Sequence, residues 1–262
     1  MSEEKKALLF EQKDRVVTLT NNDAPYNRMT LDFMDELERI LPKLEQDKSV
    51  GAIVIRGAEE EHFSVGMDLK AFAEGAKRKG NFEGVLDQRL RVIKRIENMS
   101  KPWIATMYGF CLGGGLELPL GCHFRLAAEA GCKIGLPEMD LGSVPAWGGS
   151  ARLTRCVGRD HALDLILRAK KISGPEALRI GLVNEVWPNH ELQARAQDLA
   201  HELAAQPALA VAGVLEAVVG AGERSLDEGI QAERKAVLAN TGTADAKEGM
   251  KAFIEKRKPR FH

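Results

Sequence analysis

The chain has 262 residues, with 37 lysines and arginines, 38 aspartates and glutamates, and a formal net charge of −1. This length fits one large domain or one domain with an appendage. The near-neutral charge argues against the basic surface that general nucleic-acid binding requires. A short basic run at residues 256–260 is interpreted as a solvated helix end.

Targeting and redox features point to an intracellular protein. Residues 1–6 are charged, and no apolar run typical of a secretory signal follows them. The longest weakly apolar run, residues 208–221, is interrupted by Glu216 and is too short to span a bilayer. The four cysteines match neither a CxxC motif nor a disulfide framework; they are Cys111, Cys122, Cys132 and Cys156. We therefore expect a soluble, cytoplasmic protein with reduced thiols, no membrane partner and no metal site.

Strand and helix patterns alternate in the first half of the chain. Short β-branched or apolar runs predict strands at residues 16–20, 50–56, 103–108 and 124–128. Apolar residues three or four apart predict a helix from Leu31 to Leu44 with Thr30 as its N-cap, and another along Leu86 to Ile96. This alternation predicts an α/β core with much parallel pairing. The polar, glycine-rich residues 75–84 predict a mobile loop.

Helices dominate after about residue 150. The sequence Ser173-Gly-Pro-Glu176 is a capping box that starts a helix, and Gly181 ends it. A short strand is expected within residues 180–187, followed by helices at 190–206, 208–220, 225–239 and 244–256. We therefore divide the chain into an α/β core with the active site, residues 1–198, and a helical tail, residues 199–262.

The densest functional motif is the glycine-rich run at residues 109–117, directly after a predicted strand. Consecutive glycines let the backbone turn sharply. A helix that begins near Gly114 would present free N–H groups to a developing negative charge, as in an oxyanion hole. Glu117 would then lie in the first helical turn, beside the same spot. A tight strand–helix turn without chemistry explains this motif equally well.

Two further segments contain candidate groups. Glu138 lies in a stretch rich in glycine and proline, where burial beside a ligand would raise its pKa. Taken alone, a surface loop acid is the better interpretation, and Asp140 is the nearest competitor. In the segment at residues 62–69, Gly66 permits a tight backbone and the N–H of Met67 is a second possible donor. Ser64 is not in a GxSxG elbow, and His123 is interpreted as packed or at the surface.

Together these segments resemble the crotonase, or enoyl-CoA hydratase/isomerase, superfamily. The resemblance covers nearly the whole chain, at residues 27–29, 63–69, 109–117, 137–138, 145–149, 152–154, 177–183 and 253–259. It implies a spiral of β-β-α units followed by a C-terminal helical trimerisation region. The expected assembly is a homotrimer or a dimer of trimers.

The resemblance also implies roles for individual residues. The backbone N–H groups of Met67 and Gly114 would form the oxyanion hole, and Glu117 and Glu138 match the two glutamates of the hydratases. An acyl-CoA thioester is the implied substrate, with no cofactor beyond the coenzyme A it contains. The implied CoA-binding residues are Asn27, Arg28, Met29, Val65, Asp68, Leu69, Phe253 and Lys256, the last two from the tail of the same or a neighbouring subunit.

Departures from the family pattern bear on the substrate. Trp147 stands where relatives commonly have a small residue, so we hypothesise a reshaped acyl pocket that prefers short, branched or cyclic acyl groups. Pro119 is unusual inside a helix and implies that the helix starts no earlier than supposed or bends there.

Both glutamates favour an enoyl-CoA hydratase. An enoyl-CoA isomerase or a hydroxyacyl-CoA dehydratase on the same fold stays open, and so does a non-catalytic CoA- or RNA-binding homologue.

Overall fold

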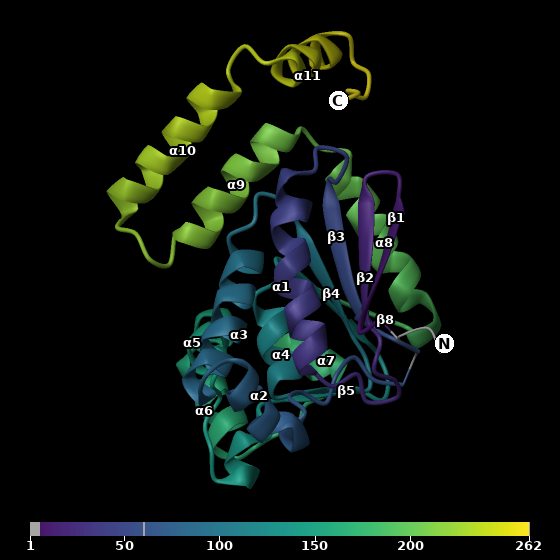
Figure 1. Ribbon diagram of the computed structural model, residues 1–262. Helices are drawn as coiled ribbons and strands as arrows, with labels where there is room; N and C mark the ends of the chain where they lie inside the picture. Colours follow the sequence, from purple (N-terminus) through teal and green to yellow (C-terminus); the bar gives the residue numbers. More distant parts are fainter. Residues whose placement is uncertain (1–5, 60, 262) are drawn as a thin grey trace.

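A six-stranded sheet forms the centre of the computed structural model, which describes residues 6–59 and 61–261 (Figure 1). The strand order is β1-β2-β3-β4-β6-β8. The strands are β1 (Leu8–Lys13), β2 (Val16–Asn21), β3 (Ala52–Gly57), β4 (Trp103–Met107), β6 (Phe124–Ala128) and β8 (Glu185–Trp187). β1 and β2 pair antiparallel, and every later neighbour in the sheet is parallel. The prediction of an α/β core with parallel pairing is confirmed.

A second layer of short extended segments lies beside the main sheet. β5 (Phe110–Leu112) pairs in parallel with β7 (Lys133–Gly135). Isolated bridges extend this layer from Ser64 to Cys111 and from Ile134 to Ile172. After β3, β4 and β6 the chain therefore enters the second layer before it continues. This repeated path is the spiral of β-β-α units expected from the family resemblance.

Helices cover the sheet through faces that the sequence pattern predicts. α1 (Leu31–Gln46) begins at Thr30, whose Oγ1 accepts a hydrogen bond from the Phe33 N–H at 3.1 Å. Its buried residues include the predicted apolar series. α8 (Asn189–Ala204) packs on β2, β3, β4, β6 and β8, and its buried alanines allow a close approach. The remaining helices of the core are α2 (Phe72–Arg78), α3 (Phe82–Glu97), α4 (Gly114–Leu120), α5 (Gly149–Val157), α6 (Arg159–Leu167) and α7 (Gly174–Arg179), with 3-10 turns η1 (Leu69–Ala71) and η2 (Pro137–Leu141).

Two local predictions need correction. Residues 75–84, predicted as a loop, contain the end of α2 and the first turn of α3. Ion pairs from Arg78 to Asp32 and from Lys79 to Asp35 tie the end of α2 and the residue after it to α1. The capping box at α7 is only half formed. Ser173 accepts from the Glu176 N–H at 3.3 Å, but the Glu176 carboxylate pairs with Lys170 instead of reaching back. Gly181 follows the helix with φ +78°, as its predicted end requires.

The helical tail consists of α9 (Ala208–Gly220), α10 (Leu226–Asn240) and α11 (Ala244–Ile254). α10 packs against α9, and Figure 1 shows α10 and α11 projecting away from the sheet. The expected core–tail boundary at residue 198 falls inside α8, a helix that packs on the sheet. Among the described residues, no single helix has the length and apolar character to cross a membrane; α8 and α9 meet that test only as a pair bent by 108°.

Candidate active site

Glu117 lies in the first turn of α4, as predicted. Gly113, with φ +55°, turns the chain from β5 into α4, and its carbonyl accepts a hydrogen bond from the Glu117 N–H at 3.0 Å. The Glu117 side chain points inward, since the residue is only 2% exposed. Pro119 is accommodated in a helix that starts at Gly114 and no earlier.

Two backbone amides hold the Glu117 carboxylate. Its Oε1 accepts from the N–H of Trp147 at 2.7 Å and from the N–H of Gly149 at 2.8 Å. Burial raises the pKa of Glu117 to about 7, although these two hydrogen bonds lower it; the Glu138 carboxylate raises it further. A carboxyl group that titrates near neutral pH can both accept and release a proton there.

Glu138 lies in the 3-10 turn η2 and reaches the site from a different part of the chain than Glu117. Within the described residues its Oε2 is buried without a hydrogen-bond partner, and burial raises its pKa. A methyl group placed on Gly113 would lie 3.1 Å from Glu138 Oε1, so this carboxylate faces the glycine turn that precedes Glu117. Asp140, the competing acid, is exposed and pairs with Lys171 at 3.1 Å.

The two predicted oxyanion donors belong to adjacent segments. A methyl group on Gly66 would lie 3.2 Å from the nitrogen of Gly114, so the backbone before Met67 runs against the start of α4. The Met29 N–H donates to the Gly66 carbonyl at 2.8 Å and fixes this segment. Across the described part of the chain, the N–H groups of Met67 and Gly114 donate to no other protein group. Two free amides at one place can stabilise a developing negative charge.

A cavity of about 190 Å³ joins these groups. Its lining residues are Val65, Gly66, Met67, Leu69, Phe82, Leu86, Gly113, Gly114, Glu117, Pro137, Glu138, Leu141, Ser143, Val144, Ala146 and Trp147. The Trp147 ring is buried, and a methyl group at Gly114 would overlap it, so only glycine fits beneath this indole. The apolar side chains suit an acyl group.

The residues expected to bind coenzyme A fall into four groups. Val65 and Leu69 line the cavity. Asp68, which lies between the lining residues Met67 and Leu69, pairs with Arg28 at 3.4 Å. Phe253 and Lys256 belong to the tail, which projects away from α4 within one chain (Figure 1).

Asn27 and Met29 have structural contacts instead. Asn27 is fully buried, and its Nδ2 donates to the carbonyls of Ala58 and His62 at 2.8 and 2.7 Å. Met29 is 2% exposed. Of residues 27–29 only Arg28 has a partly exposed side chain, and its guanidinium already pairs with Asp23 at 2.7 Å.

Sequence reasoning missed the wall of the cavity formed by α3 and by the loop before Trp147. Phe82 and Leu86 are four residues apart and face the cavity together, a spacing that the sequence displays. His123, interpreted as packed or at the surface, is half-buried and packed: its Nδ1 accepts from the Trp103 N–H at 3.0 Å, and desolvation lowers its pKa to about 4.

Comparison with known proteins decides the family. A family model described as enoyl-CoA hydratase/isomerase matches residues 11–262. The chain belongs to the enoyl-CoA hydratase/isomerase family. Within this family it is 39% identical to the probable enoyl-CoA hydratase of Bacillus subtilis, over 94% of this chain and 95% of that protein. It is 34% identical to the short-chain-enoyl-CoA hydratase of Clostridium acetobutylicum, over 96% and 95%.

A solved structure agrees with this family assignment. The enoyl-CoA hydratase from Bacillus anthracis superposes with a TM-score of 0.91 at 32% identity, over 97% of this chain and 98% of that one. The crotonase-type fold expected from the family's motifs is therefore confirmed.

Proposed function

We propose that this family member is an enoyl-CoA hydratase, which reversibly adds water to the double bond of a 2-enoyl-CoA thioester. One observation carries the proposal: Glu117 and Glu138 line one cavity beside the free amides of Met67 and Gly114. The names of the relatives, among them a short-chain-enoyl-CoA hydratase and a crotonyl-CoA hydratase from Syntrophomonas wolfei, support it.

The proposed mechanism uses each group once. The thioester oxygen accepts hydrogen bonds from the N–H groups of Met67 and Gly114, each of which is worth about 3 kcal/mol in the transition state. Glu117 takes a proton from a water molecule, whose oxygen forms a bond to Cβ. The electron pair of the double bond moves toward the thioester, and Glu138 delivers a proton to Cα. The raised pKa of both carboxyl groups suits these transfers. No cofactor is needed beyond the coenzyme A of the substrate.

The tail completes the proposed assembly. Many large apolar side chains of α9–α11 are exposed in the single chain: Leu209, Val214, Val218, Leu226, Ile230, Val237, Leu238, Met250, Phe253 and Ile254. Burying them against other copies supports a homotrimer or a dimer of trimers. In such an assembly Phe253 and Lys256 would serve the CoA site of a neighbouring subunit. A cytoplasmic location is part of the same proposal.

The test is direct. Purified protein is incubated with short, long, branched and cyclic 2-enoyl-CoA thioesters, and product mass is followed with the loss of the conjugated absorbance. We expect a gain of one water that Glu117→Gln abolishes. A moved double bond without a mass change would instead mean an isomerase. Turnover of 3-hydroxyacyl-CoA alone would mean a dedicated dehydratase, and tight binding without turnover would mean a CoA- or RNA-binding protein.

A further inference from the structure

Arg89 is a fully buried arginine in the core of α3. Its Nη1 donates to the Gln88 Oε1 at 2.7 Å and to the Val85 carbonyl at 3.3 Å. Within the described residues, Nε and Nη2 have no hydrogen-bond partner, and no carboxylate pairs with the guanidinium. Burying a charge without a partner is costly, so this arginine opposes folding as it stands.

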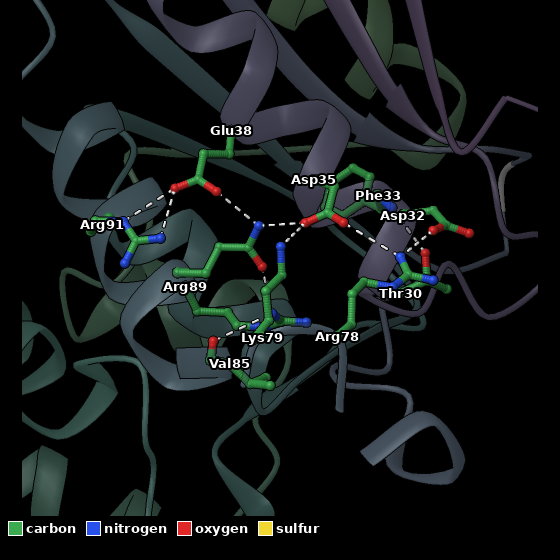
Figure 2. Close-up of polar contacts among 11 residues, drawn as sticks. Thr30, Asp32, Phe33, Asp35, Glu38, Arg78, Lys79, Val85, Arg89 and Arg91 are labelled. Atoms are coloured by element: carbon green, nitrogen blue, oxygen red, sulfur yellow. Dashed lines mark hydrogen bonds and ion pairs between the residues drawn. The ribbon is translucent and has the colours of Figure 1, made fainter. Parts of the chain in front are cut away.

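The acidic residues nearby are already paired with other groups (Figure 2). Gln88 Nε2 donates to Asp35 Oδ1 at 2.6 Å and to Glu38 Oε2 at 2.9 Å. Lys79 pairs with Asp35, and Arg91 pairs with Glu38. These carboxylates are hydrogen-bonded to Gln88 and not to Arg89. Burial lowers the pKa of Arg89, although the charges of these carboxylates raise it, and a guanidinium stays protonated in proteins.

Arg89 lies one helical turn beyond the part of α3 that lines the cavity. Phe82 and Leu86 line the cavity from α3, and Arg89 follows Leu86 by three residues, on the same helical face. The central guanidinium carbon is 5.8 Å from the centre of the Trp147 ring, and that ring forms a cavity wall. Arg89 itself does not line the cavity, so a ligand that extends past the Trp147 ring would meet its guanidinium next.

We propose that Arg89 binds a carboxylate at the end of the acyl group, so that the preferred substrates are 2-enoyl-CoA thioesters with a terminal carboxylate. This inference rests on the proposed hydratase function. Nε and Nη2 are the two donors on one side of a guanidinium, and their parallel N–H bonds match the two oxygens of a carboxylate. An anionic acyl end would supply the hydrogen-bond acceptors that Nε and Nη2 lack among the described residues.

The test compares two isosteric substrates. Glutaconyl-CoA ends in a carboxylate, and 5-methyl-2-hexenoyl-CoA carries two methyl groups in place of the two oxygens. For Arg89→Met we expect kcat/KM to fall roughly 100-fold for glutaconyl-CoA and to stay within roughly threefold for the neutral substrate. Arg89→Lys keeps the charge and loses the fork, so roughly a tenfold loss on glutaconyl-CoA alone is expected. Arg95→Met, on the exposed side of α3, is the matched control and should change neither.

A purely structural role for Arg89 predicts other results. Equal losses on both substrates in Arg89→Met and Arg89→Lys would overturn the proposal, and so would a wild-type preference for the neutral substrate. Thermal unfolding separates the roles further. We expect Arg89→Met to be at least as stable as the wild type, because an apolar side chain of similar size replaces an unpaired buried charge.

Failure of the hydratase proposal would be seen separately. Absence of turnover with any enoyl-CoA, crotonyl-CoA included, would reject the hydratase and leave binding to decide the role of Arg89. Calorimetric titration with glutaryl-CoA and 5-methylhexanoyl-CoA, which are saturated, needs no chemistry. We expect roughly 100-fold tighter binding of glutaryl-CoA that Arg89→Met removes; equal affinities would overturn the carboxylate site.

Discussion

Trp147 holds the Oε1 of Glu117 at 2.7 Å through its backbone N–H, while its indole ring covers Gly114. One residue therefore fixes the proposed base and shapes the acyl cavity. Because the first contact is made by the backbone and the second by the side chain, substitutions at position 147 separate the two roles.

Trp147→Ala should widen the acyl cavity and leave the base in place. We expect the ratio of kcat/KM for a ten-carbon over a four-carbon enoyl-CoA to rise about tenfold, since removing a few methylene-sized volumes of obstruction changes discrimination by 1–3 kcal/mol. Stability should fall by about 3–5 kcal/mol in urea unfolding. Trp187→Ala, outside the cavity in β8, is the control: it should reduce stability without changing the chain-length ratio. An unchanged ratio in Trp147→Ala would reject the pocket assignment.

Replacing either carboxyl group by an amide should abolish proton transfer and preserve the fold. For Glu117→Gln the amide oxygen still accepts from Trp147 and Gly149, so crystal structures of wild type and variant should superpose. We expect kcat to fall about 10²–10⁴-fold in Glu117→Gln and in Glu138→Gln. Asp140→Asn, two residues from Glu138 and at the surface, should retain full activity. A similar loss of kcat in Asp140→Asn would contradict the assignment of the acid to Glu138.

Hydration should depend on pH through Glu117. The base must be deprotonated, and its pKa is about 7. Because Glu138 must keep the proton that it delivers to Cα, kcat/KM for crotonyl-CoA should follow a bell-shaped pH profile, with one limb set by Glu117 near pH 7 and the other by the raised pKa of Glu138. A rate that is flat from about pH 5 to pH 8 would assign the water activation to another group.

The same carboxyl group should reduce stability as pH rises. Its pKa is 4.5 unfolded and about 7 folded, so between these values the native state binds a proton that the unfolded chain has lost. Stability from Glu117 is therefore fully present below pH 4.5 and falls through pH 7, by about 3 kcal/mol in total. Urea unfolding at several pH values should show this slope in the wild type and a flatter one in Glu117→Gln. Parallel slopes would contradict the assignment.

Gly114→Ala should destabilise the protein, because the Trp147 indole occupies the space of the new methyl group. The new methyl group overlaps the indole, and such overpacking costs about 1–3 kcal/mol. In Gly114→Ala/Trp147→Ala the clash is gone, so the double variant should be more stable than the sum of the single losses implies. Urea unfolding of the four proteins gives the coupling energy. Strictly additive changes in the free energy of unfolding would show that the indole moves aside without a free-energy cost.

The parts of the fold with local patterns were predictable. α1 starts at a threonine cap and repeats apolar residues over four turns, and the tail helices are separated by Pro207 and by glycines. β1 was missed because it is an edge strand with mostly exposed residues, so no burial pattern marks it. β5 and β7 have three residues each and depend on pairing with each other across the chain.

In the candidate site, too, some residues are predictable from local motifs and others depend on tertiary structure. Glu117 and the glycines around it form a local motif, so sequence places them together. That Glu138 faces the same cavity depends on tertiary structure, since η2 alone resembles a surface turn. The sequence does not single out Arg89, because local sequence cannot show that its Nε and Nη2 atoms lack hydrogen-bond partners among the described residues. The helix at residues 72–78 owes its place to acids of α1 more than 40 residues earlier in the chain.

The pairing of β5 with β7 fixes the distance between the two backbone segments that lead to Glu117 and Glu138. Leu112 lies opposite Gly135, and the Gly113 N–H donates to the Gly135 carbonyl at 3.0 Å, so the segments that lead to Glu117 and Glu138 are joined by backbone alone. Side-chain changes in α3 or in the loop before Trp147 leave that spacing intact. The cavity can thus be retuned for new acyl groups over evolutionary time while the two carboxylates of the proposed mechanism keep their separation.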